Sequence, residues 1–119
     1  MGDITKNFSV QEFACRCGNC SVDGTKIDRR LVYKLQVIRE IIDKPIYINS
    51  ACRCDRHNND VGGALMSYHL SGMAVDIACD NSLDRCDLVK QSLNQGLSVG
   101  ISAKFIHVDT RDIPIIFLY

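Results

Sequence analysis

The sequence predicts an α+β fold, a small antiparallel sheet with helices packed on one side. Apolar residues recur every three or four positions in two segments, as on the buried face of an amphipathic helix. In several shorter segments they alternate with other residues, as in half-buried strands. With 119 residues, 46% of them apolar, the chain has room for one core. Residues 1–119 are therefore expected to form a single domain.

The first expected element is a short helix over residues 9–14. Ser9 and Glu12 have the spacing of a capping box, and Phe8 and Phe13 can pack against each other at the helix start.

Residues 29–44 show the strongest helical pattern, and this helix is expected to pack on the sheet. Asp28 stands at the N-cap position, and Pro45 ends the helix. The apolar stripe consists of Leu31, Leu35, Ile38 and Ile42, widened by Val32 and Ile41.

Residues 46–50 and 73–79 predict two strands separated by a long segment. In the second strand, the alternation places Asp76 between small residues, on the face opposite the branched residues. The intervening segment 51–72 is rich in Asn, Asp and Gly and is expected to be irregular. Long loops in compact domains often carry function.

The last part of the chain predicts a helix and two strands. A helix over residues 83–95 is expected to be capped by Ser82 and stopped by Gly96. Residues 97–102 and 104–109 then predict two adjacent strands joined by a short turn.

The charge balance argues against two classes of partner. Fourteen basic residues balance fourteen acidic ones, and neither sign forms a long block, so neither nucleic acid nor a membrane is an expected partner. No apolar run has the length of about 20 residues that spans a bilayer, and the first residues lack a signal-peptide pattern. Cytoplasmic synthesis and a monomeric state are expected.

A candidate metal site comes from two of the three histidines and a carboxylate. Asp76 lies in an apolar strand, and a buried carboxylate needs a strong partner. His69 lies in the long loop, and His107 shares a strand face with Phe105 and Asp109. Two imidazoles and one carboxylate suit a tetrahedral zinc whose fourth position stays open for catalysis.

The segment "SYHLSGMAVD" (residues 67–76) resembles the S-x-H-x-x-G-x-A-x-D motif of a peptidase family. These are the zinc D-alanyl-D-alanine carboxypeptidases and L-alanyl-D-glutamate endopeptidases, relatives of the hedgehog signalling domain fold. The resemblance continues in "NFSVQEFACRCGNC", "INSACRC", "HNNDVGGA" and "FIHVDTR", so it spans nearly the whole chain in order. The greatest similarity is to short phage and bacterial members.

The resemblance implies roles for five residues. It places zinc on His69, Asp76 and His107. It gives Arg53 the task of holding substrate carbonyl or carboxylate groups, which suits a fork of fixed donors. Ser67 would offer its hydroxyl to the bound peptide. The simpler alternatives are a surface ion pair for Arg53 and a turn cap for Ser67.

The general base is where the sequence departs from the family pattern. Many relatives carry a carboxylate three positions before the last zinc histidine, and this chain has Lys104 there. A protonated lysine would repel the metal unless it is turned away. Asp109 is the nearest alternative base, but it could equally orient His107 or pair with Arg111.

Seven cysteines, an odd number, exclude complete internal disulfide pairing. A second, structural zinc site is one interpretation, although C-x-C-x-x-C is a weaker signature than paired C-x-x-C motifs. A disulfide from the loop at residues 15–25 to "ACRC" is another, and the sequence favours free thiols over both. The candidate ligands are Cys15, Cys17, Cys20, Cys52 and Cys54.

The resemblance implies hydrolysis of peptidoglycan stem peptides by a metal-activated water, at the D-Ala-D-Ala end or the L-Ala-D-Glu bond. Such an endolysin-like enzyme would act at the cell wall after release from the cytoplasm. The alternative is a binding or structural module that retains zinc but hydrolyses peptides weakly, as Lys104 could indicate.

Overall fold

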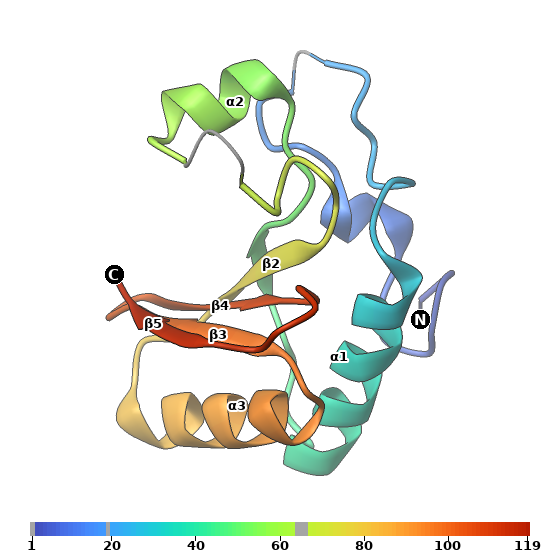
Figure 1. Cartoon of the computed structure of the whole chain (residues 1–119). Helices are drawn as coiled ribbons and strands as arrows, with labels where there is room; N and C mark the ends of the chain where they lie inside the picture. The colour runs from blue at the N-terminus through green and yellow to red at the C-terminus, as the bar shows by residue number, and fades with distance from the viewer. Residues whose placement is uncertain (1, 19, 64–66) are drawn as a thin grey trace.

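The computed structural model describes residues 2–18, 20–63 and 67–119, and it confirms the α+β fold (Figure 1). The elements are η1 (Val10–Phe13, a 3-10 turn), α1 (Arg29–Ile42), β1 (Ile48–Ser50), α2 (Asp55–Asp60), β2 (Ala74–Ala78), α3 (Ser82–Asn94), β3 (Ser98–Ile101), β4 (Phe105–Asp109) and β5 (Ile116–Leu118). Helices α1 and α3 lie on one side of the sheet, and the short α2 lies on the other.

The sheet has five strands in the order β1-β2-β4-β3-β5. The expected antiparallel arrangement holds for β1–β2, β2–β4 and β3–β4, but β5 runs parallel to β3, so the sheet is mixed. The reason is that β2 and β3 already occupy both edges of β4. The chain reverses its direction beyond β4 and adds β5 at the free edge of β3, where that direction is parallel.

Helix α1 begins as the sequence predicts and buries a narrower stripe. The Asp28 carboxylate accepts the Arg30 backbone N–H at 2.9 Å, as expected of an N-cap. The predicted widening at Ile41 is wrong, because this side chain is 55% exposed on the flank away from the core. The helix ends at Ile42, where Asp43 adopts a left-handed conformation with φ of 52°. The buried members of the stripe are Leu31, Val32, Leu35 and Ile38.

The N-terminal capping box is present on a single turn of helix. The Ser9 backbone N–H donates to the Glu12 carboxylate at 2.7 Å. The rings of Phe8 and Phe13 lie 6.0 Å apart between centroids, and both are buried, so the expected contact at the helix start is confirmed.

Two other helix predictions need correction. Segment 51–72 is not irregular throughout, because it contains α2; its sequence, DRHNND, has no apolar periodicity that could have revealed a helix. Residues 64–66 of the same segment lie outside the described residues. The N-cap of α3 is Asn81, whose side chain accepts the Asp84 N–H at 2.9 Å, and Ser82 is the first helical residue.

The strands divide their side chains between a core face and a polar face. Branched residues of β2, β4 and β3 pack in one core with α1 and α3, whereas Asp76 and His107 line a pocket. The central core residues of these strands are Val75, Ile77, Val99, Ile106 and Val108. Among the helices of the described residues, none has the length and apolar character needed to cross a membrane.

Candidate active site

Strand pairing brings two of the predicted metal ligands together, Asp76 and His107. In the antiparallel β2–β4 pair, Asp76 stands directly opposite His107. Side chains of such cross-strand pairs on one face are close neighbours. His107 Nδ1 lies 3.1 Å from Asp76 Oδ1. The sheet register therefore fixes these two side chains.

His69 reaches the same carboxylate from the turn that precedes β2. Its Nδ1–H donates to the backbone carbonyl of Ala51 at 2.8 Å, which leaves Nε2 with a lone pair. This Nε2 lies 3.3 Å from Asp76 Oδ1, is buried, and makes no hydrogen bond to any described residue. A buried lone pair that faces a carboxylate oxygen needs a cation between them.

The donor set fits zinc. Ligand atoms of His69, Asp76 and His107 all lie within 4.8 Å of one another, and all three residues are buried. Two imidazole nitrogens and one carboxylate are a common zinc donor set with an open fourth position. The structure therefore brings together the three residues that the sequence predicts as ligands.

Asp109 lies behind His107, two residues further along β4. His107 Nε2 lies 2.7 Å from Asp109 Oδ2, so this nitrogen donates to the carboxylate and leaves Nδ1 to face Asp76. Arg111 closes the other side with a bidentate contact to Asp109, at 2.8 Å from Nε and 2.6 Å from Nη2. A carboxylate on the outer nitrogen of a ligating histidine fixes the orientation of the ring.

Arg53 holds the outer oxygen of Asp76. Its Nη2 lies 3.3 Å from Asp76 Oδ2, while Nε donates to Ser50 Oγ and Nη1 to Asn58 Oδ1, both at 3.1 Å. The side chain of Arg53 is only 10% exposed. Its main contact is thus a buried ion pair with a candidate metal ligand, rather than the surface ion pair considered from the sequence.

The charges of the site follow from burial and hydrogen bonding. Burial alone would raise the pKa of Asp76, but its close contacts with the His107 and His69 imidazoles outweigh burial and hold the pKa at about 2. Burial would likewise raise the pKa of Asp109, yet Arg111 and His107 hold it well below its usual range. Burial would lower the pKa of His107, but the contacts with Asp109 and Asp76 raise it.

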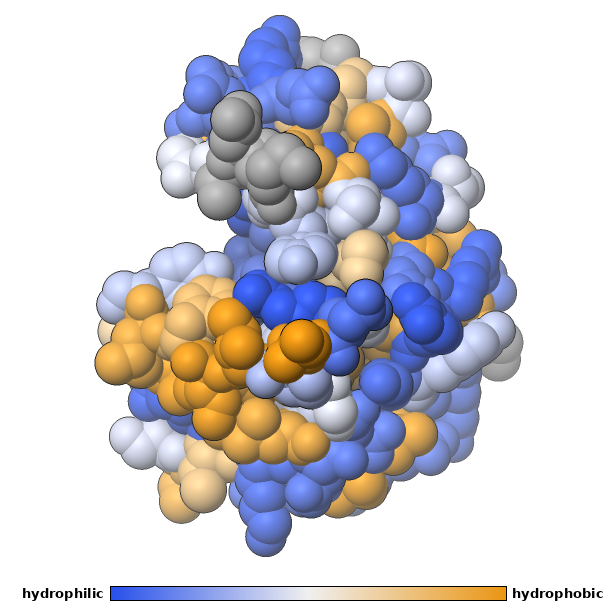
Figure 2. All heavy atoms as spheres, in the orientation of Figure 1, coloured by the Kyte–Doolittle hydropathy of each residue, from blue (hydrophilic) through white to orange (hydrophobic). Residues whose placement is uncertain are grey.

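The pocket over these residues has a volume of about 730 Å³ (Figure 2). Figure 2 shows the hollow opening between the part of the molecule that carries α2 and the sheet, with apolar side chains along one border. His69, Asp76 and His107 line it, as do Arg53 and Ser67. The backbone N–H of His69 donates to Ser67 Oγ at 3.2 Å, which is the turn-cap contact considered from the sequence.

Lys104 is not among the described residues that line this pocket. It is exposed in the turn between β3 and β4, and the described pocket lining includes neither Lys104 nor Asp109. Asp109 is fully buried, with both oxygens engaged by His107 and Arg111. These contacts favour the orienting role of Asp109 over the role of general base.

Sequence reasoning missed the aromatic wall of the pocket. The ring of Phe117 in β5 lies 5.3 Å from that of His107, and Arg111 stacks over Tyr68 at 4.6 Å. Gly100, opposite His107, makes room for this wall, because a Cβ there would lie 2.5 Å from the Phe117 ring. The signal that could have revealed β5 is the apolar run at residues 115–119.

The fold and site define a small α+β domain with a buried zinc-type donor set at the floor of a pocket. Residues 6–109 match the profile of Peptidase M15, and the chain therefore belongs to this family. It is also similar to a zinc D-Ala-D-Ala carboxypeptidase from Streptomyces albus G, with 37% identity over 68 residues. That match covers 56% of this chain but only 26% of the Streptomyces protein. The family and fold predicted from the sequence are confirmed.

Proposed function

We propose that this protein is a zinc-dependent peptidase that hydrolyses peptidoglycan stem peptides, at the D-Ala-D-Ala end or the L-Ala-D-Glu bond. The observation that carries the proposal is the buried Nε2 of His69, which has no hydrogen-bond partner among the described residues and faces Asp76 and His107 at the floor of an open pocket. The name of the Streptomyces relative supports the D-Ala-D-Ala alternative. Action at the cell wall after release from the cytoplasm is part of the proposal.

His69, Asp76 and His107 would hold the metal. When bound there, zinc supplies a Lewis acid that polarises the scissile carbonyl and lowers the pKa of a water nucleophile. The chain supplies the orientation: the Ala51 carbonyl fixes the tautomer of His69, and Asp109 fixes that of His107. We therefore assign Asp109 a positioning role.

Arg53 and Arg111 give the pocket a positive character that suits the carboxylates of stem peptides. Arginine has more N–H groups than the three contacts of Arg53 use, so its guanidinium can hold Asp76 and still donate to a substrate carbonyl. In the proposal, Ser67 donates its hydroxyl to the peptide backbone, and Tyr68 and Phe117 pack against its apolar groups.

One observation favours a second candidate function, a zinc-retaining binding or structural module with weak turnover. Among the described pocket residues, Asp76 is the only carboxylate, and it is a metal ligand. With Lys104 exposed outside the pocket, no second carboxylate in the described lining is available to accept the proton of the attacking water.

The test is incubation of the zinc-loaded protein with a synthetic stem pentapeptide, with products identified by mass spectrometry. Loss of the terminal D-Ala or cleavage after L-Ala, absent with His69→Ala, would support the peptidase and identify the bond. Saturable, zinc-dependent binding of an intact peptide would select the second candidate. Neither cleavage nor binding would overturn both.

A further inference from the structure

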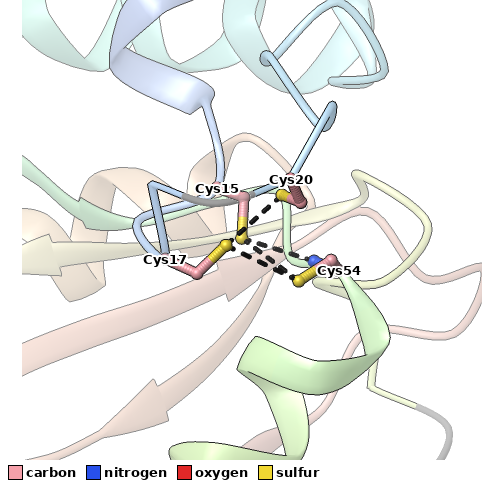
Figure 3. A group of neighbouring side chains, drawn as sticks. All are labelled: Cys15, Cys17, Cys20 and Cys54. Atoms are coloured by element: carbon pink, nitrogen blue, oxygen red, sulfur yellow. Dashed lines mark hydrogen bonds between the residues drawn. The ribbon is translucent and has the colours of Figure 1, made fainter.

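Four cysteines from two distant segments meet at one point (Figure 3). Cys15, Cys17 and Cys20 lie in the loop that follows η1, and Cys54 lies at the N-cap of α2, more than thirty residues later. Their sulfur atoms all lie within 4.8 Å of one another. The fold thus assembles a cluster that the spacing C-x-C-x-x-C alone did not complete.

The sulfur positions match the edges of a tetrahedron around zinc. The Cys17 and Cys20 sulfurs are 3.4 Å apart, and that of Cys54 lies 3.8 Å from those of Cys15 and Cys17. With Zn–S bonds of about 2.3 Å, tetrahedral geometry places sulfurs about 3.8 Å from each other. A disulfide would need about 2.0 Å, so these separations are those of thiols arranged around a centre.

Backbone N–H groups are directed at two of the four sulfurs. The backbone N–H of Cys54 donates to the sulfur of Cys15 at 3.4 Å, and that of His57 donates to the sulfur of Cys54 at 3.3 Å. Hydrogen bonds to ligating sulfurs tune and fix metal–thiolate centres. Cys52, the other candidate in "ACRC", is 1% exposed in the hydrophobic core and stands apart from the cluster.

The cysteine loop is also tied to its surroundings independently of the sulfurs. The Cys15 N–H donates to the Val22 carbonyl at 3.0 Å, which closes the loop. Arg16 Nη2 donates to the carbonyls of Glu12 and Ile48, at 2.7 and 2.9 Å. The loop is therefore held against the end of the sheet at which Cys54 follows β1.

We propose that Cys15, Cys17, Cys20 and Cys54 bind a second zinc ion as a closed structural site. Four thiolates satisfy the tetrahedral preference of zinc and leave no position for substrate, and soft sulfur ligands select zinc over magnesium or calcium. This site is distinct from the three-ligand site at the pocket floor, and its existence does not depend on the proposed peptidase function.

The second zinc fixes the segment that organises the first site. Residues 51–54 contain the carbonyl that fixes His69, the Arg53 side chain that holds Asp76, and the Arg53 N–H that donates to the His69 carbonyl at 3.1 Å. Cys54 ends this segment. Binding of its thiolate to a metal holds the segment in place, and this part of the inference rests on the proposed function.

The test is the metal content of the full chain, purified under reducing conditions with zinc and measured by elemental analysis. We expect about two zinc ions per chain for the unmodified protein and about one each for Cys20→Ser and His69→Ala. The matched control is Cys86→Ser, an exposed cysteine outside the cluster, which should keep both. Cys20 is also exposed, so its replacement leaves the core intact, and circular dichroism verifies the fold.

Cobalt substitution identifies the ligands of each site. His69→Ala loaded with cobalt should show thiolate-to-metal charge-transfer absorption, and Cys20→Ser should lack it. One zinc per chain that depends on His69 but not on Cys20 would overturn the second site and leave the proposed function standing. Zinc that depends only on Cys20 would confirm the cysteine site and overturn the metal site at His69, Asp76 and His107.

Coupling between the sites has its own readout. Cys20→Ser should weaken zinc binding at the His69 site about tenfold, as loss of a ligand-orienting contact does, whereas Cys86→Ser should leave it unchanged. Equal affinities in the two variants would overturn the coupling.

Discussion

The two candidate metal centres of this protein are built in opposite ways. At the pocket floor, β2 and β4 place Asp76 opposite His107, and the two histidines are oriented by the hydrogen bonds that they donate to the Ala51 carbonyl and the Asp109 carboxylate. The cysteine cluster takes no ligand from a strand, because three sulfurs come from one loop and Cys54 from the start of a short helix. Sites with three protein ligands suit catalysis, and closed sites with four suit structure.

This difference predicts different dependence on metal. Without zinc, Asp76 at the pocket floor keeps its ion pair with Arg53, and the pairing of β2 with β4 that places Asp76 opposite His107 does not involve the metal. At the cysteine cluster, the sulfurs contact one another and the backbone N–H groups of Cys54 and His57, and sulfur is a weak donor and acceptor in such contacts. The order of the cysteine loop should therefore depend on zinc more strongly than the order of the sheet does.

The largest expected effect is that of Cys54→Ser on stability. Removing a ligand of a structural zinc should cost several kcal/mol, about 5 or more, because the free energy of binding such a metal is folding free energy. Urea unfolding of the zinc-loaded variant, compared with Cys86→Ser, measures it. A loss no larger than that of the Cys86 control would mean that the cluster does not stabilise the fold.

Asp76→Ala should come next, and it acts on both stability and metal content. It removes zinc from the pocket floor and leaves the nearly buried Arg53 without its carboxylate partner. Breaking a buried ion pair on one side costs about 3–5 kcal/mol. Denaturation of the metal-free proteins isolates this cost. If metal-free Asp76→Ala had the same free energy of unfolding as the metal-free unmodified protein, the ion pair with Arg53 would not stabilise the site.

Asp109→Asn separates the two roles considered for this carboxylate. As a positioning residue, Asp109 should affect metal affinity, so its replacement should weaken zinc binding about 10- to 100-fold. The cobalt–thiolate absorption of the cysteine cluster should stay unchanged. Competition with a chelator gives the affinity. Unchanged affinity together with abolished hydrolysis would restore Asp109 as the general base.

These sites also show what the sequence could and could not predict. The ligand types and the family resemblance of "SYHLSGMAVD" and "FIHVDTR" predicted His69, Asp76 and His107 as one set, and their convergence in the structure agrees. The pairing of β2 with β4 could not be predicted, because register depends on partners distant in the chain.

The cysteine cluster was undetermined for a similar reason. The sequence alone does not tell which of Cys52 and Cys54 joins the cluster. The path of the chain after β1 places Cys52 in the core and Cys54 beside the other three cysteines. The helix α2 that begins beside Cys54 lacked an apolar period, and the parallel placement of β5 depends on which sheet edge remained free. In each case the missing information was tertiary.

The smallest expected effect belongs to the contact between the start of α1 and the end of β4, the strand that carries His107. The Asp28 carboxylate caps α1 and accepts the Thr110 hydroxyl at 2.9 Å, just beyond the end of β4. Burial would raise the pKa of Asp28, but hydrogen bonds from Arg30 and Thr110 hold it below its ordinary value. The ionised carboxylate therefore stabilises the fold above its unfolded pKa of about 4, and this contribution is lost as pH falls through the lower folded pKa.

Asp28→Asn keeps a good N-cap but removes the charge, so it should cost about 1 kcal/mol or less at neutral pH. The difference in unfolding free energy between the two proteins should stay constant above about pH 5 and shrink below about pH 4, because only the aspartate protein loses this stabilisation. Thermal unfolding across this pH range measures this difference. The samples carry zinc in the cysteine cluster and no metal at the pocket floor. A difference that grows on acidification would show that the Asp28 charge does not stabilise the junction between α1 and β4, and the rigidity of the pocket floor would then have to come from the strand pairing alone.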